Sequence, residues 1–194
     1  MALILASQSP RRKELLAQLG YRFTCSPADI DESVQLNESP GHYVTRLAIE
    51  KAEHIAKTAN LDDFILGSDT SVVKNSHILG KPKDLSESIE MLSMLSGSSH
   101  QVLTAIAVIK DKTVKSMLIE TDVTFKVLTE TEMTNYWLTN EPQDKAGSYG
   151  IQGIGGQFIT QIKGSYSAVV GLPLYETALL LTRMGLESPL SQST

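Results

Sequence analysis

The chain has 194 residues, of which 41% are hydrophobic and 20% charged, and its formal net charge at pH 7 is −5. This composition is typical of a globular protein, and the acidic balance argues against general nucleic-acid binding. Cys25 is the only cysteine, which excludes an internal disulfide, and the four histidines lack the helical spacing of a zinc site. The apolar start, ALILA, is too short for a membrane span and lacks the preceding positive charges of a secretory signal. We therefore expect one domain over residues 1–194, located in the cytoplasm.

Helices and strands are expected throughout the chain. Apolar spacing predicts strands over 2–5, 64–73 and 101–109, one or two strands over 115–128, and helices over 10–19, 42–57, 86–95 and 174–184. Thr129 and Glu132 form a capping box that opens a further helix. Seven of the thirteen glycines lie between Gly147 and Gly171, which indicates that backbone conformation dominates there. The mixture predicts an α/β protein.

The first helix has an unexpected charge at its start. In SQSPRR, residues 7–12, Ser9 and Pro10 are a favourable N-cap and first helical residue. Arg11 and Arg12 then occupy the first turn, where the helix dipole is positive and each cation costs about 0.3–1 kcal/mol. Two serines, free backbone N–H groups and two guanidinium groups would suit a phosphate chain. The alternative is that both arginines are solvated on the helix surface. We expect Arg12→Ala to weaken triphosphate binding and slightly stabilise the unliganded protein.

Three further segments carry charged candidates. Asp69, in LGSDTSVV, follows an apolar strand, where a carboxylate is costly unless it is paired or bound to metal; the alternative is a turn aspartate in a hairpin. Glu32 lies in the acidic segment DIDES, which by itself reads as a solvated loop. Glu32 and Asp69 could bind a divalent cation that accompanies a triphosphate. Lys81, in GKP, is by itself an ordinary lysine beside a proline, and it is a candidate phosphate ligand only together with other phosphate ligands.

Taken together, five segments resemble the Maf family of nucleoside triphosphate pyrophosphatases. They are LASQSPRRKELL, GSDT, GKP, DKAGSYGIQG and GSYSAVVGLPLYET, and they span nearly the whole chain in the expected order. The resemblance implies an inosine triphosphate pyrophosphatase-like fold, with a mixed twisted sheet, flanking helices and two lobes around a cleft. It also implies hydrolysis of a nucleoside triphosphate to its monophosphate and pyrophosphate with a divalent cation, which could be magnesium, manganese or cobalt.

The resemblance further assigns roles to individual residues. It implies that Asp69 is the catalytic base and Glu32 a ligand of the metal or of water. Phosphate ligands would be Ser7, Arg12, Lys51 and Lys81, the last also counted as catalytic. A bound triphosphate would make the cationic first turn favourable.

Three positions distinguish branches of that family. Arg11, Thr70 and Gln152 resemble the branch that hydrolyses dTTP and UTP, whereas the branch acting on N7-methylated GTP resembles SPWR, DQ and a KSEG-like segment. A neutral amide such as that of Gln152 can both donate and accept, which suits the edge shared by thymine and uracil. The expected role is removal of non-standard or modified pyrimidine nucleotides, and a homodimer is possible. The alternatives are a phosphotransferase, the N7-methyl-GTP activity, or a nucleotide-binding regulator of cell division without turnover.

Overall fold

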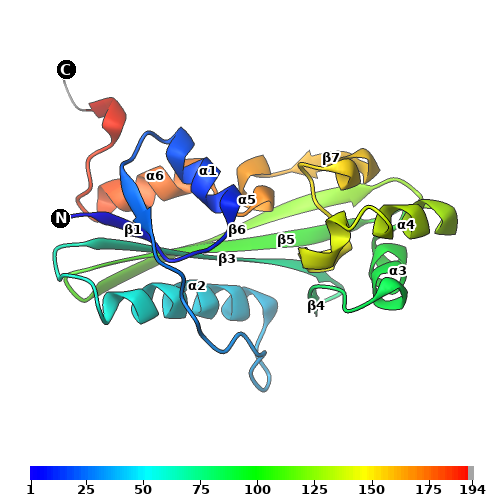
Figure 1. Ribbon diagram of the computed structural model, residues 1–194, viewed down its shortest axis with the longest axis horizontal. Coiled ribbons are helices and arrows are strands. Elements are labelled where there is room, and N and C mark those ends of the chain that lie inside the picture. The colour runs from blue at the N-terminus through cyan, green and yellow to red at the C-terminus, as the bar shows by residue number, and fades with distance from the viewer. Residues whose placement is uncertain (192–194) are drawn as a thin grey trace. The chain divides into compact units, whose positions relative to one another are not determined.

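A computed structural model describes residues 1–191 (Figure 1). It contains a seven-stranded sheet in the order β2-β1-β3-β5-β6-β7, with β4 paired to β3. The strands are β1 (Leu3–Leu5), β2 (Phe23–Cys25), β3 (Phe64–Lys74), β4 (His77–Leu79), β5 (Ser99–Lys110), β6 (Thr113–Phe125) and β7 (Ile159–Lys163). The α-helices are α1 (Pro10–Gln18), α2 (Pro40–Ala56), α3 (Leu85–Leu95), α4 (Glu130–Trp137), α5 (Tyr166–Val170) and α6 (Leu174–Arg183). Within residues 1–191, no helix is both long enough and apolar enough to cross a membrane.

The chain divides into two compact units. The first comprises Met1–Asp69, Thr104–Ile119 and the chain from Gly171 onward, and the second comprises Thr70–Leu103 and Glu120–Val170. In the first unit, β1 lies between β2 and β3 and is parallel to both. Helix α2 covers one face of these strands, and α1 and α6 lie on the other (Figure 1).

The second unit is built around antiparallel pairs and an aromatic core. Strand β4 pairs with the end of β3, and β6 pairs with β7. Helices α3 and α4 pack against each other. Its core contains Val72, Leu92, Leu95, Val123, Phe125, Met133, Tyr136, Tyr149 and Phe158.

Side-chain caps start the helices where the sequence predicts them. Ser9 accepts a hydrogen bond from the backbone of Arg12, and the capping box of Thr129 and Glu132 is present at α4. The expected helix over 42–57 begins earlier, at Pro40, because Ser39 caps it in the same Ser-Pro arrangement as α1. Of the expected 115–128, residues 115–125 form part of one strand, β6, rather than two, and 126–128 lie beyond its end.

Asp69 lies inside a continuous strand. Strand β3 runs through it without interruption, and the turn comes later, at Asn75 and Ser76, whose φ angles are 49° and 65°. The alternative of a hairpin-turn aspartate is therefore wrong, and Asp69 is a carboxylate in the interior of a buried strand.

Candidate active site

The turn between β1 and α1 brings Ser7 and Arg12 together. Ser7 is buried and accepts hydrogen bonds from the backbone of Ser9 at 3.1 Å and from Nη1 of Arg12 at 3.4 Å. Nε of Arg12 donates to the carbonyl oxygen of Gly171 at 3.0 Å. Arg12 is thus bonded within the first unit rather than free in solvent, so the surface alternative is wrong for this residue, although both Arg11 and Arg12 are partly exposed. The first turn contains no acidic residue.

A glycine in β3 lets α2 approach the strand closely. A Cβ added to Gly67 would lie 2.1 Å from the carbonyl oxygen of Ala48 in α2. Ala48 and Ala52 are fully buried small residues on this helix. Because alternate residues of a strand face the same side, Asp69 points toward α2 like Gly67. The short helix–strand distance brings the side chain of Lys51 within reach of Asp69.

Lys51 joins two carboxylates. Its Nζ lies 2.7 Å from Oδ1 of Asp69 and 2.7 Å from Oε1 of Glu32. The side chains of Lys51 and Asp69 are each 10% exposed, whereas that of Glu32 is 56% exposed. One carboxylate therefore comes from a buried strand and the other from the solvent side of the same ammonium.

Burial and charge act in opposite directions on this cluster. Burial raises the pKa of Asp69, and the charges of Lys51 and Arg12 partly offset that increase. Burial lowers the pKa of Arg12, with Asp69 and Glu32 acting against it. A carboxyl group with a raised pKa next to two cations is suited to accept a proton.

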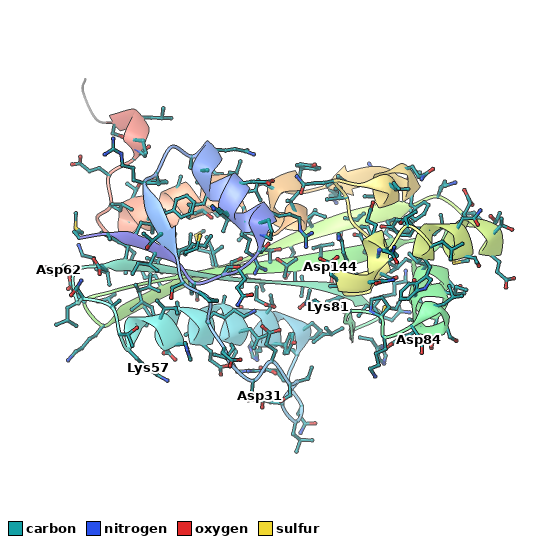
Figure 2. The ribbon with its side chains drawn as sticks, viewed as in Figure 1. Asp31, Lys57, Asp62, Lys81, Asp84 and Asp144 are labelled. Atoms are coloured by element: carbon teal, nitrogen blue, oxygen red, sulfur yellow. The ribbon has the colours of Figure 1, made fainter. Side chains whose placement is uncertain are left out.

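Four further residues were predicted for the site. Arg11 is in α1, in the first unit. The other three belong to the second unit: Thr70 is half-buried in β3, Lys81 is exposed between β4 and α3 (Figure 2), and Gln152 is exposed in the glycine-rich segment. The structure therefore brings together Ser7 with Arg12, and Glu32 with Lys51 and Asp69, within the first unit.

The segment that carries Gln152 is folded around a carboxylate that sequence reasoning missed. Oε2 of Glu141 accepts from the backbone of Ile154 at 2.7 Å, and Oε1 accepts from the backbone of Gly155 at 3.0 Å and from the Tyr136 hydroxyl at 2.7 Å. A Cβ added to Gly153 would lie 2.2 Å from Oε2. The glycines here allow the backbone to approach Glu141, and nothing local in the sequence identifies their partner.

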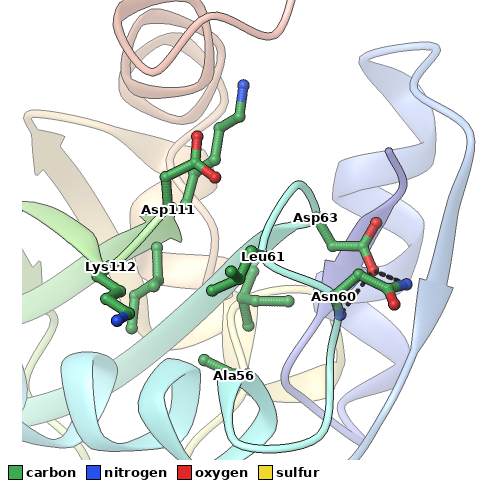
Figure 3. Close-up of a pocket in the computed structure, with 9 residues that line it drawn as sticks. Ala56, Asn60, Leu61, Asp63, Asp111 and Lys112 are labelled. Carbon is green, nitrogen blue, oxygen red and sulfur yellow. Dashed lines mark hydrogen bonds between the residues drawn. The ribbon is translucent and has the colours of Figure 1, made fainter.

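A pocket of about 80 Å³ lies elsewhere in the first unit (Figure 3). It is lined by Ala56, Asn60, Leu61, Asp63, Ile65, Ile109, Lys110, Asp111 and Lys112. Asn60 donates to Asp63 from its backbone and its side chain. None of the predicted site residues lines this pocket.

The carboxylate oxygens of Glu32 and Asp69 are the type of ligand that a hard divalent cation prefers. Both are carboxylates, and both already face the same positive group, Lys51. Within residues 1–191, no three His, Cys, Asp or Glu side chains are grouped so that they could hold a metal by themselves. A cation such as Mg²⁺ is commonly held by one or two carboxylates together with substrate phosphates and water.

Comparisons with known proteins agree on family and fold. Residues 2–184 match a family model described as Maf-like protein. A dTTP/UTP pyrophosphatase of Colwellia psychrerythraea is 60% identical over 187 residues, covering 94% of this chain and 88% of the relative. One of Pseudoalteromonas atlantica is 54% identical over 188 residues, covering 95% and 97%. The solved structure of a HAM1 protein from Coxiella burnetii, at 19% identity, has a TM-score of 0.50 and covers 94% of this chain and 100% of its own. This likeness confirms the mixed α/β fold.

Proposed function

Because the chain belongs to the Maf family, we propose that it hydrolyses dTTP and UTP to dTMP or UMP and pyrophosphate. The observation that carries the proposal is the Lys51 ammonium at 2.7 Å from both Asp69 and Glu32. It is supported by relatives at 60% and 54% identity that are named dTTP/UTP pyrophosphatase.

Each residue of the cluster has a distinct part in this reaction. Arg12, Ser7 and Lys51 bind phosphate oxygens, and Lys81 adds a further cation. Asp69 takes a proton from water as the water oxygen bonds to phosphorus. The phosphoanhydride bond between the α and β phosphates breaks, and pyrophosphate leaves with the bridging oxygen. A carboxyl with a raised pKa suits this proton transfer.

Glu32 and Asp69 would hold the divalent cation. When bound, the cation neutralises negative charge on the triphosphate and polarises its oxygens. Lys51, which lies between the two carboxylates, is then available to turn toward a phosphate oxygen. Magnesium, manganese and cobalt remain the candidates.

The products distinguish this function from the alternatives. The protein is incubated with dTTP or UTP and Mg²⁺ or Mn²⁺, and the phosphorus products are identified by ³¹P NMR. Pyrophosphate with the monophosphate is expected. Orthophosphate release would contradict the proposal, transfer to an added acceptor would indicate a phosphotransferase, and binding without turnover would indicate a regulator.

Asp69→Asn tests the base, because it keeps the shape and removes the charge. Turnover should fall by roughly 10²–10⁴, the usual range for a positioned base. Asp62→Asn is the matched control, since Asp62 is an exposed aspartate in the turn that precedes β3 (Figure 2). Near-normal turnover in folded Asp69→Asn would remove this residue from catalysis.

Substrate choice is tested at Arg11, Thr70 and Gln152. Gln152→Glu should lower kcat/KM for dTTP and UTP about ten- to a hundredfold, since a carboxylate cannot donate to a base carbonyl. Arg11→Trp, Thr70→Gln and Gln152→Glu combined should raise relative activity on N7-methylated GTP, whose cationic ring can stack on tryptophan. Equal losses on both nucleotides would mean that these residues do not read the base.

The biological setting is part of the same proposal. We expect a cytoplasmic enzyme that removes non-standard or modified pyrimidine nucleotides, and a homodimer is expected from the family. Analytical ultracentrifugation tests the dimer, and a panel of modified nucleotides tests the role.

A further inference from the structure

Glu32 lies in the segment between β2 and α2, which itself contains no helix or strand. This segment runs from Ser26 to Ser39 and extends below the N-terminal part of α2 in the view of Figure 1; Asp31 marks it in Figure 2. The Glu32 side chain is 56% exposed, yet its carboxylate lies 2.7 Å from Lys51. Exposed ion pairs contribute only about 0–1 kcal/mol, so this pair alone does not fix the segment.

Helix α2 holds two successive backbone carbonyl groups of this segment, those of Glu32 and Ser33. The Tyr43 hydroxyl donates to the carbonyl oxygen of Glu32 at 2.8 Å, and Nη2 of Arg46 donates to the carbonyl oxygen of Ser33 at 3.0 Å. Tyr43 and Arg46 are three positions apart and are therefore neighbours on the helix surface. Lys51 belongs to the same helix. Both members of the Glu32–Lys51 ion pair are therefore held by α2, Lys51 as part of it and Glu32 through these backbone hydrogen bonds.

Arg46 is itself held in place. Its Nε and Nη2 donate to the two oxygens of Glu38 at 2.6 and 2.8 Å, and Nη1 donates to Glu50 at 3.0 Å. The guanidinium lies 5.6 Å from the centre of the Tyr43 ring. These bonds lower the pKa of Glu38 to about 2, so the Arg46–Glu38 pair stays charged at neutral pH. The planar guanidinium of Arg46 bonds both oxygens of Glu38 at once, which fixes its orientation, and the single ammonium group of a lysine would not do this.

We propose that Tyr43 and Arg46 are positioning residues that set the place of the Glu32 carboxylate in the active site. The proposal rests on the proposed function. At Glu32 and Ser33 their hydrogen bonds go to backbone oxygens and not to the Glu32 carboxylate, so they act on where that carboxylate lies and not on its chemistry. A displacement of about 1 Å in a reacting group can lower the rate by 10²-fold.

Tyr43→Phe is the sharpest test, because it removes one hydroxyl and keeps the ring. Amide hydrogen exchange over residues 29–37 should become at least severalfold faster, while exchange in β3 stays unchanged. Mn²⁺, titrated alone and followed by electron paramagnetic resonance, should bind severalfold more weakly. Turnover of dTTP should fall about 10- to 100-fold, with KM changed less than kcat. Tyr175→Phe is the control, since Tyr175 is 73% exposed.

Arg46→Lys and a double variant separate positioning from a general structural effect. Arg46→Lys keeps the charge and should give the same pattern as Tyr43→Phe. If Tyr43 acts through Glu32, adding Tyr43→Phe to Glu32→Gln should cause no further loss of turnover or of Mn²⁺ affinity. Multiplied losses, or unchanged exchange and Mn²⁺ binding in Tyr43→Phe, would overturn the proposal. The two proposals can fail separately. If the unmodified protein releases no pyrophosphate, the proposed function is wrong. Hydrogen exchange in Tyr43→Phe still decides whether Tyr43 holds the segment.

Discussion

Nζ of Lys51 lies 2.7 Å from Oδ1 of Asp69 although the two residues are on different elements, α2 and β3. Burial raises the pKa of Asp69, and Lys51 is the largest influence acting against that rise. Glu32, on the other side of the ammonium, acts in the opposite sense and raises the pKa of Asp69. The ionisation of Asp69 therefore depends on the balance between burial and Glu32, which raise its pKa, and Lys51 and Arg12, which lower it.

Removing either neighbour should move the pKa of Asp69 in a predictable direction. Lys51→Met should raise it further, because the buried carboxylate loses its nearest cation, and Glu32→Gln should lower it, because a repelling charge is lost. Carbon-13 NMR titration of the aspartate carboxyl groups in the unliganded protein measures both shifts, with Asp62 as the exposed reference. Shifts of the same sign in both variants would contradict this electrostatic account.

Gly67→Ala should disturb the site without touching a charged residue. The added Cβ would lie 2.1 Å from the Ala48 carbonyl oxygen, so α2 must move away from β3. Overpacking of this kind costs about 1–3 kcal/mol, and the separation of Lys51 from Asp69 should also lower dTTP turnover. Gly80→Ala is the stability control, because a Cβ there meets no atom within 4 Å. An unchanged melting temperature in Gly67→Ala would show that the helix can yield at no cost.

Arg12→Ala should weaken triphosphate binding and also destabilise the unliganded protein. From the sequence alone a slight stabilisation is expected, since a cation leaves the positive end of α1. The structure reverses this expectation, because Arg12 donates to Gly171 and Ser7, and hydrogen bonds from a charged donor contribute about 1.5–3 kcal/mol against about 0.3–1 kcal/mol for the dipole.

The control for Arg12→Ala is Lys13→Ala in the same turn. Lys13 is exposed, so its removal should leave the melting temperature unchanged or slightly higher. Thermal melting of both variants without nucleotide decides between the two expectations. A higher melting temperature for Arg12→Ala would restore the dipole argument.

His100 should make the second unit less stable in acid. It is 3% exposed and contacts the Tyr149 hydroxyl through Nε2 at 2.8 Å, and burial, followed by the charge of Lys74, lowers its pKa to about 4. Between pH 6.5 and 4 the unfolded chain binds a proton that the folded protein does not, so stability decreases as the pH falls. The loss over this range is about 3 kcal/mol.

His100→Phe should remove this pH dependence. The variant is less stable at neutral pH because the buried Tyr149 hydroxyl loses its partner, so the informative quantity is the slope of unfolding free energy against pH. Urea unfolding at several pH values between 4 and 7 measures it in both proteins. Equal slopes would exclude His100 as the titrating group.

Glu141→Gln should loosen the segment that carries Gln152. In the carboxylate, one oxygen accepts from the backbone N–H of Ile154 and the other from that of Gly155. An amide has only one acceptor oxygen, so its NH₂ group would face one of these two N–H donors and leave it unpaired. Leaving one such donor unpaired costs about 1–3 kcal/mol. Hydrogen exchange should increase over residues 150–156 and not in the first unit. Glu90→Gln, an exposed change in α3, should have no such effect.

Local patterns in the sequence determined the main elements and the type of chemistry. Ser9 with Pro10 predicts the start of α1, and the apolar run around Asp69 predicts β3, because caps and periodicity depend on residues within one or two turns. The glycine-rich segment was recognised as a backbone feature. Strands β2, β4 and β7 were missed because each has only three to five residues and mixes polar with apolar ones, whereas the equally short β1 is an unbroken apolar run.

Only the tertiary structure decided which of these residues meet. Arg12 binds the carbonyl oxygen of Gly171, 159 positions away, and Lys51 reaches Asp69 because Gly67 lets α2 lie close to β3. The contacts of Tyr43 and Arg46 with the Glu32 segment likewise follow from packing across a long loop. Such contacts depend on the distances between elements, which close packing sets to fractions of an ångström. These distances cannot be read from the residues that are adjacent in the sequence.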